Sequence, residues 1–251
     1  MKPSPKTRFP TANGYLTDLT RTKYISAAVL SGVLPTDAHR IPEIVALSAP
    51  ESRAMPIQFW QLFSILGPEG IIAIVQEFYT RVFDDERWFT SIFERVGGLN
   101  HHINTQASMW ADVMGGGPYY HGAEFRLSFH HTHNAHALMN AEGAQRWVTL
   151  MVQALDASEV QMQNDPRVRQ SLNTFLSHFF AKYAEEFAFE NRETFGETNQ
   201  PWRRKIQFRT MTENAIAAMS EHDLRAGLED LGIDVSQVSD KQDLIRKAID
   251  L

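Results

Sequence analysis

The sequence predicts an all-α protein built from packed helices. Between residues 56 and 189, apolar residues recur at the three- and four-residue spacing of amphipathic helices, and no segment shows the alternation of a half-buried strand. Glycine and proline interrupt this pattern repeatedly, which indicates several separate helices joined by short connections. Helices of this kind bury their apolar stripes against one another.

The clearest helix is predicted over residues 68–83. Pro68 suits a first helical turn, and the charge of Glu69 is favourable near the positive end of the helix dipole. The broad apolar stripe of this helix consists of Ile71, Ile72, Ile74, Val75, Phe78, Tyr79, Val82 and Phe83. Asp84 and Asp85 follow it and mark its end.

Three further helices are predicted over residues 101–114, 141–155 and 166–187. A short aromatic segment, residues 88–93, precedes the first of them. The run Gly115-Gly116-Gly117-Pro118 ends the helix over 101–114. Because no strand precedes this run and no phosphate-loop helix follows it, it indicates a sharp bend between helices rather than nucleotide binding.

The chain divides into three predicted segments: an N-terminal extension (1–55), a helical domain (56–189) and a C-terminal extension (190–251). Two short helices are expected near the C-terminus, the first capped by Ser220 and Gly232 and the second by Ser239. They weakly resemble a SAP-like helix–extended–helix module. Such modules often bind nucleic acid, but acidic residues predominate here, so we expect the extensions to contact a protein partner or a second copy of the chain.

Composition narrows the possible functions. The 251 residues include no cysteine, which excludes disulfides, zinc ribbons, iron–sulfur clusters, thiolate-ligated haem and a cysteine nucleophile. The net charge of −6 argues against nucleic-acid binding, and no apolar run approaches the roughly 18 residues that span a bilayer. Residues 1–40 are basic, like an organelle transit sequence or a plain basic extension. The expected compartment is the cytoplasm, a mitochondrion or a plastid, rather than the outside of the cell.

Histidines are unevenly distributed. Of the ten in the chain, five lie in one short stretch: His121, His130, His131, His133 and His136. On a helix, His133 shares a face with both His130 and His136. Three interpretations stay open at this point: a multi-histidine zinc or non-haem iron site, a single histidine bound to haem iron, or histidines that only pack or face solvent.

Three segments resemble the group 2 truncated haemoglobins, particularly the plant type. Residues 78–93 are similar to the helix B and distal-corner region of that family, residues 114–120 to its glycine–proline break after helix E, and residues 144–156 to its helix G. The similarity covers residues 59–187. It implies a truncated globin-like two-over-two helical sandwich with additional terminal helices, and haem b as cofactor.

The resemblance also implies roles for six residues. Counting forward from Gly115 at the family's spacing reaches His133 as the iron ligand, whereas counting back from the helix G tryptophan lands one residue off, so His131 and His136 remain alternatives. Thr132 also stands where the family usually has arginine. The other residues that the resemblance places around the haem are Tyr79, Phe93, His102, Gln106 and Trp147.

These residues imply the binding of dioxygen or another diatomic gas. A neutral histidine leaves the sixth iron position free, and the donors of Tyr79, Gln106 and Trp147 would stabilise negative charge on the ligand. Three hydrogen-bond donors around one ligand favour slow release of the bound gas. Slow release suits redox chemistry on the ligand, such as nitric oxide dioxygenation or peroxide reduction. The alternative is a globin-like structural subunit of a larger assembly that has lost haem, suggested by the long extensions and the altered surroundings of His133.

Overall fold

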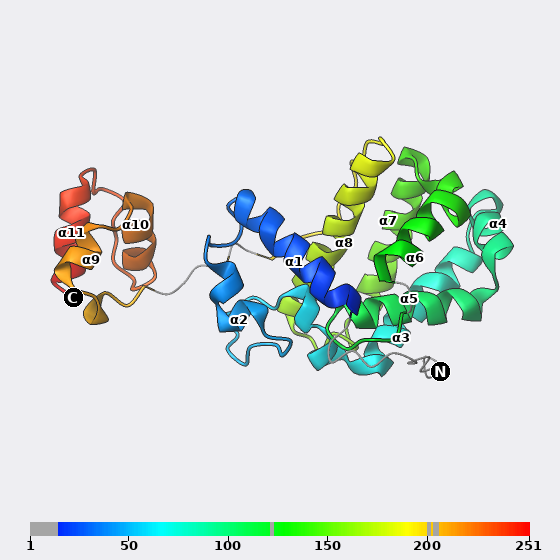
Figure 1. The fold of residues 1–251 in the computed structure, drawn as a ribbon, viewed down its shortest axis with the longest axis horizontal. Coiled ribbons are helices and arrows are strands. Elements are labelled where there is room, and N and C mark those ends of the chain that lie inside the picture. The colour runs from blue at the N-terminus through cyan, green and yellow to red at the C-terminus, as the bar shows by residue number, and fades with distance from the viewer. Residues whose placement is uncertain (1–14, 121–122, 200–201, 203–205) are drawn as a thin grey trace. The chain divides into compact units, whose positions relative to one another are not determined.

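The structure is a computed structural model that describes residues 15–120, 123–199, 202 and 206–251. The described residues form helices and no strand, which confirms the predicted all-α class (Figure 1). The chain forms two compact units, residues 1–202 and 203–251. The basic segment before residue 15, His121 and the basic residues 203–205 lie outside the described residues.

Four long helices form the centre of the first unit: α3 (Phe63–Phe83), α5 (Leu99–Val113), α7 (Ala141–Asp156) and α8 (Pro166–Glu186). Helix α3 packs against both α5 and α7. Aromatic rings join the remaining faces: Trp110 of α5 lies 5.3 Å from Phe175 of α8, and Trp147 of α7 lies 4.9 Å from Phe180 of α8. Helices α3 and α8 therefore each contact both α5 and α7, which agrees with the predicted two-over-two arrangement.

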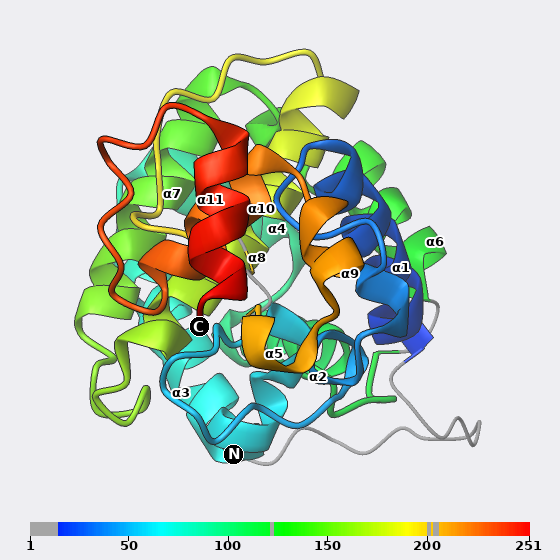
Figure 2. The same ribbon diagram turned by 90° about the vertical axis from the view of Figure 1, so that its left-hand side faces the viewer.

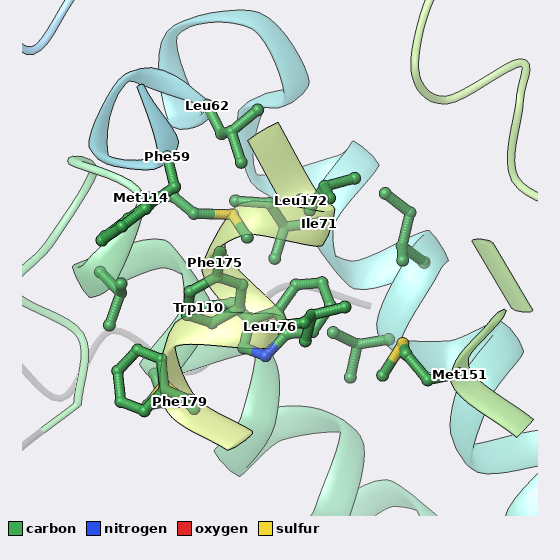
Figure 3. Close-up of a cluster of buried hydrophobic side chains, with 14 of the residues drawn as sticks. Phe59, Leu62, Ile71, Trp110, Met114, Met151, Leu172, Phe175, Leu176 and Phe179 are labelled. Atoms are coloured by element: carbon green, nitrogen blue, oxygen red, sulfur yellow. The ribbon is translucent and has the colours of Figure 1, made fainter. Parts of the chain in front are cut away.

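The core lies where these four helices meet. Figure 3 shows Trp110 beside Phe175 and Leu176 of α8, with side chains of α3 and α7 around them. Trp110 is fully buried, and Phe175 is 1% exposed. Each large aromatic ring removes much apolar surface from water, so this cluster supplies a large share of the stability of the first unit.

Helix α3 begins earlier than predicted. Gly67 breaks its regular geometry with φ 59° and ψ 179°, and Pro68 begins the straight part of the helix, where a missing backbone donor is tolerated. The aromatic segment after α3 is itself helical, α4 (Arg87–Val96), and it buries Phe89 and Phe93. The apolar face of α4 thus closes one side of the helical core.

The glycine run forms a tight junction between α5 and the chain before α3. Gly115 has φ +98°, and a Cβ atom there would lie 2.1 Å from the carbonyl oxygen of Trp60. The backbone N–H of Phe63 donates to the carbonyl of Met114 at 3.0 Å, which also requires this close approach. After the break follow α6 (Ala123–Phe129), a π-helical turn (His130–Asn134) and a short 3-10 turn (His136–Leu138).

The predicted N-terminal extension, where described, is part of the first unit rather than a separate segment. Helix α1 (Tyr15–Leu30) packs against α5 and α6, and the short α2 (Pro42–Val45) follows it. The side chain of Arg167 donates to three backbone carbonyls of the loop between α2 and α3, those of Pro50, Ser52 and Met55. These contacts join residues far apart in the sequence, so local patterns could not predict them.

The C-terminal boundary also differs from the prediction at residue 190. The chain from residue 187 to residue 199 packs back onto α7 and α8, with Phe195 buried there, so the second unit begins at residue 203. No helix among the described residues combines the length and apolar character needed to cross a bilayer.

The second unit contains α9 (Glu213–Ala217), α10 (Glu221–Glu229) and α11 (Lys241–Ile249), and α11 packs against the other two (Figure 2). It has its own buried cluster, formed by Phe208, Ile216, Leu224, Leu228, Val235, Leu244, Ile245 and Ala248. Ser220 caps α10 as predicted, because its hydroxyl accepts from the backbone N–H of Asp223. Asp240, rather than Ser239, caps α11 by accepting from the N–H of Gln242.

Candidate functional site

The first unit encloses a cavity of about 360 Å³ between α3, α4, α5, α6, α7 and α8. This volume falls within the range of small-molecule and cofactor pockets, which are mostly apolar with a few polar groups. Five of the six residues predicted to surround a haem line this cavity: Tyr79, Phe93, His102, Gln106 and Trp147. The sixth, His133, does not.

Tyr79 and Gln106 form the polar part of the cavity wall. The Tyr79 hydroxyl donates to Oε1 of Gln106 at 3.2 Å and so joins α3 to α5. Tyr79 is 5% exposed, and burial raises the pKa of its phenol well above the usual range. The hydroxyl therefore stays protonated and remains a hydrogen-bond donor at any physiological pH.

His102 lies inside the protein, not on the outer face of α5. Its Nε2 atom is 2.8 Å from the carbonyl oxygen of Phe93, and its ring stacks on Tyr79 with centroids 5.3 Å apart. Burial lowers the pKa of His102, and the carbonyl of Phe93 opposes this effect. The hydrogen bond holds the imidazole against α4.

Phe93 and Trp147 form apolar walls. The Phe93 ring packs on the rings of Tyr79 at 6.0 Å and Phe89 at 5.1 Å. Trp147 packs between α3 and α8, with its ring 4.7 Å from Phe78 and 4.9 Å from Phe180. A flat apolar group in the cavity would contact both walls.

Two adjacent histidines line the cavity from the turn after α6. The ring of His131 lies 4.1 Å from that of Tyr183, and its Nδ1 atom is buried without a hydrogen-bond partner among the described residues. Burial lowers the pKa of His131 to about 3, with a further contribution from His130, whose own pKa burial lowers to about 4. Both imidazoles are therefore neutral near pH 7, the state in which histidine binds a metal.

His133 is exposed and lies away from the cavity. Its ring stacks on Phe129 at 4.1 Å, and its Nδ1 atom is 3.1 Å from the carbonyl oxygen of Phe129. Two residues correspond to roughly 200° around a helix, so His131 and His133 cannot face the same side. Of the alternatives, His131 lines the cavity, and His136 is exposed, with its ring 6.0 Å from that of Phe187.

The histidines of this stretch that the structure describes do not assemble into a non-haem metal site. Within the described part of the chain, no group of three or more histidine and carboxylate side chains is arranged to hold one metal ion. The sequence does not distinguish His131 from His133, because an apolar residue stands four positions before each of them, Leu127 and Phe129. The structure distinguishes them, since Leu127 is buried and Phe129 is 49% exposed.

Sequence reasoning also missed a cationic residue of the site. Arg126 lines the cavity, and its guanidinium lies 4.7 Å over the ring of Tyr120. A porphyrin is an apolar plane with a carboxylate edge. The cavity offers apolar walls, a neutral imidazole with a buried nitrogen, and a guanidinium, so the residues present fit such a group.

Paired helices around an apolar cavity, with a histidine on one wall and a tyrosine–glutamine pair on another, define a haem-binding globin. Residues 61–181 match the family of bacterial-like globins. The chain is 30% identical over 170 residues to two-on-two hemoglobin-3 of Arabidopsis thaliana, an alignment that covers 66% of this chain and 85% of the relative. It is 32% identical over 128 residues to group 2 truncated hemoglobin 3-1 of Lotus japonicus, covering 51% of this chain and 73% of the relative. The chain belongs to the group 2 truncated haemoglobins, which confirms the predicted resemblance.

Proposed function

We propose that this globin binds haem b through the imidazole of His131 and holds a diatomic gas near Tyr79, Gln106 and Trp147. The observation that carries the proposal is that His131 and these three residues line one cavity. His133, the iron ligand predicted from spacing, is exposed and stacked on Phe129. This position favours His131 as the iron ligand. When bound, haem supplies an iron that takes up a diatomic gas and exchanges electrons.

The proximal residues hold the cofactor. Burial keeps the His131 imidazole neutral, so a nitrogen lone pair is available to a metal. Phe93 and Trp147, held by their ring contacts, would exclude water from a bound porphyrin. The Arg126 guanidinium is suited to pair with a porphyrin carboxylate, because charge-assisted bonds of this type are strong.

The distal residues retain the gas. Because the single Tyr79 proton is donated to Oε1 of Gln106, the amide of Gln106 is oriented with its N–H groups away from that bond. The amide and the Trp147 N–H then act as donors toward negative charge in a low-dielectric cavity. Such donors slow ligand release, which supports nitric oxide dioxygenation or peroxide reduction rather than rapid gas delivery.

The proposal is tested by absorption spectra of the purified protein supplied with haem. We expect wild type to show a Soret band that shifts with carbon monoxide, His131→Ala to lose it, and added imidazole to restore it. His133→Ala is the matched control and should keep the wild-type spectrum. A Soret band that is lost in His133→Ala and kept in His131→Ala would assign the iron to His133. The absence of a Soret band in wild type would favour the alternative of a haem-free structural subunit.

The redox activity needs a separate measurement. Oxygen-loaded protein mixed with nitric oxide should yield nitrate stoichiometrically, and hydrogen peroxide with a reducing dye should be consumed if the protein is a peroxidase. Trp147→Phe and Tyr79→Phe should each lower the retention of gas and the yield of nitrate. A protein that does neither reaction would contradict the proposed redox function but not haem binding.

A further inference from the structure

The chain that follows α8 turns back along that helix. Phe187 donates its N–H to the carbonyl of Tyr183, Phe189 donates to that of Ala184, and Ala188 adopts a left-handed φ of 53°. We name residues 187–199 the return segment. Its direction reverses directly after the last turn of α8, so it runs antiparallel to the helix.

Hydrogen bonds fix the far end of the return segment. The Asn173 side chain donates to the carbonyl of Glu197 at 2.7 Å, and the N–H of Asn199 donates to the Thr174 hydroxyl at 2.8 Å. The Asn199 side chain also donates to the carbonyl of Ile57 at 2.8 Å. Asn173 and Thr174 lie in the first half of α8, so the segment is held along much of the helix.

Between these ends, two aromatic side chains point into the first unit. Phe189 lines the cavity itself. Phe195 does not line it, yet it is only 2% exposed, and its ring packs edge-on against Trp147 at 6.1 Å and Phe180 at 5.1 Å. Phe195 can therefore affect the cavity through its contact with Trp147.

The orientation of Trp147 depends on ring packing. Among the described residues, no hydrogen bond fixes its indole N–H, so its neighbours Phe78, Phe180 and Phe195 hold the ring. Phe78 belongs to α3 and Phe180 to α8, whereas Phe195 comes from the irregular return segment. Removal of the Phe195 ring would leave a space beside the indole and allow it other rotamers.

We propose that Phe195 is a positioning residue of the haem cavity: the return segment holds the Trp147 indole where its N–H faces the diatomic ligand, and so slows ligand release. This inference rests on the proposed function, because it assigns to Trp147 a contact with the gas. It adds a residue from outside the cavity, and from outside the segment matched to the globin family, to the set that determines release.

The first test measures dioxygen release by stopped flow in haem-loaded wild type, Trp147→Phe, Phe195→Ala and the double variant. We expect Phe195→Ala to speed release by at least about threefold, and Phe195→Leu to restore most of the wild-type rate. The double variant should release no faster than Trp147→Phe alone, since both changes remove the same interaction. Independent, multiplicative effects in the double variant would overturn the inference.

The second test uses haem-free protein and does not depend on gas binding. The five tryptophans give five indole N–H signals in a ¹⁵N-labelled sample, and Trp147→Phe identifies the one from Trp147. Phe195→Ala should shift or broaden that signal and leave the signal of Trp60 unchanged, since the Trp60 N–H donates to the carbonyl of Ile44 at 2.8 Å. Phe208→Ala is the matched control: Phe208 is also 2% exposed but belongs to the separate cluster of the second unit.

The outcomes separate the two proposals. If Trp147→Phe changes release and Phe195→Ala does not, the positioning role is wrong and the proposed function stands. If Trp147→Phe leaves release unchanged, Trp147 does not contact the gas, and both its assigned role and the inference are wrong. If Phe208→Ala shifts the Trp147 signal as Phe195→Ala does, the effect is not local and the inference is wrong.

Discussion

Arg146 of α7 donates two hydrogen bonds to the carboxylate of Asp85, directly after α3; its Nε atom lies 2.7 Å from Oδ2, and Nη2 donates to Oδ1. The Asp85 side chain is 5% exposed and that of Arg146 is 31% exposed. This bidentate ion pair joins the end of α3, which carries Tyr79, to α7, which carries Trp147. It therefore fixes two walls of the cavity relative to each other.

Asp85→Asn should lower the free energy of unfolding at pH 7 by about 1–3 kcal/mol, because it leaves Arg146 without its anionic partner. The hydrogen bonds from Arg146 hold the pKa of Asp85 below its usual range. The stabilisation is therefore present above the pKa of an unfolded aspartate and is lost as the pH falls through the lower, folded pKa. Urea unfolding from pH 7 down to pH 3 should show the two proteins converging in acid. Arg192→Ala breaks the exposed ion pair with Glu190 and should leave the free energy of unfolding unchanged at every pH in this range.

Gly115→Ala should destabilise the first unit by at least about 2 kcal/mol, since the left-handed φ disfavours any Cβ and this one would collide with the carbonyl of Trp60. Gly98→Ala is the control, because Gly98 has an ordinary φ of −76° and open space at its Cβ position. Thermal unfolding compares the two. Equal melting temperatures would mean that the junction between α5 and the chain before α3 can relax.

Tyr79→Phe should speed dioxygen release by about 10-fold to 100-fold, because it removes the bond that orients Gln106 in a buried site. Burial raises the pKa of the Tyr79 phenol above its usual range, so the wild-type release rate should show no Tyr79 titration between pH 6 and pH 9. Tyr24→Phe is the control, because Tyr24 packs on Phe59 and His178 and does not line the cavity. A release rate unchanged in Tyr79→Phe would show that Tyr79 does not act on the ligand.

His178→Phe should flatten the acid dependence of stability. Burial between Tyr24 and Phe59 lowers the pKa of His178 to about 4, so the folded protein binds fewer protons than the unfolded chain between pH 6.5 and pH 4. Stability then falls as the pH falls through this window, by up to about 3 kcal/mol from this group. Urea unfolding at pH 7 and pH 4.5 should show a smaller difference for His178→Phe than for wild type. The exposed His39, changed to Phe, should retain the wild-type difference.

Local sequence patterns predicted most of the helices. The stripe from Ile71 to Phe83, the glycine run at Gly115 and the cap at Ser220 each act within one or two helical turns, so they can be recognised without knowledge of distant contacts. The family resemblance rests partly on the ordered spacing of Tyr79, Phe93 and Trp147, which can also be read from the chain without knowledge of tertiary contacts. The structure brings these three residues to one cavity.

The sequence by itself determined the helical class, the globin family and one set of residues around a cavity. Only the tertiary structure decided that His131 rather than His133 lines that cavity, because the direction of each side chain depends on how the π-helical turn after α6 packs against the other helices. It also decided that α1 and the return segment belong to the first unit. These segments are held by contacts such as Phe195 with Trp147 and Arg167 with the loop at Ser52, whose partners are distant in sequence and meet only when the helices pack.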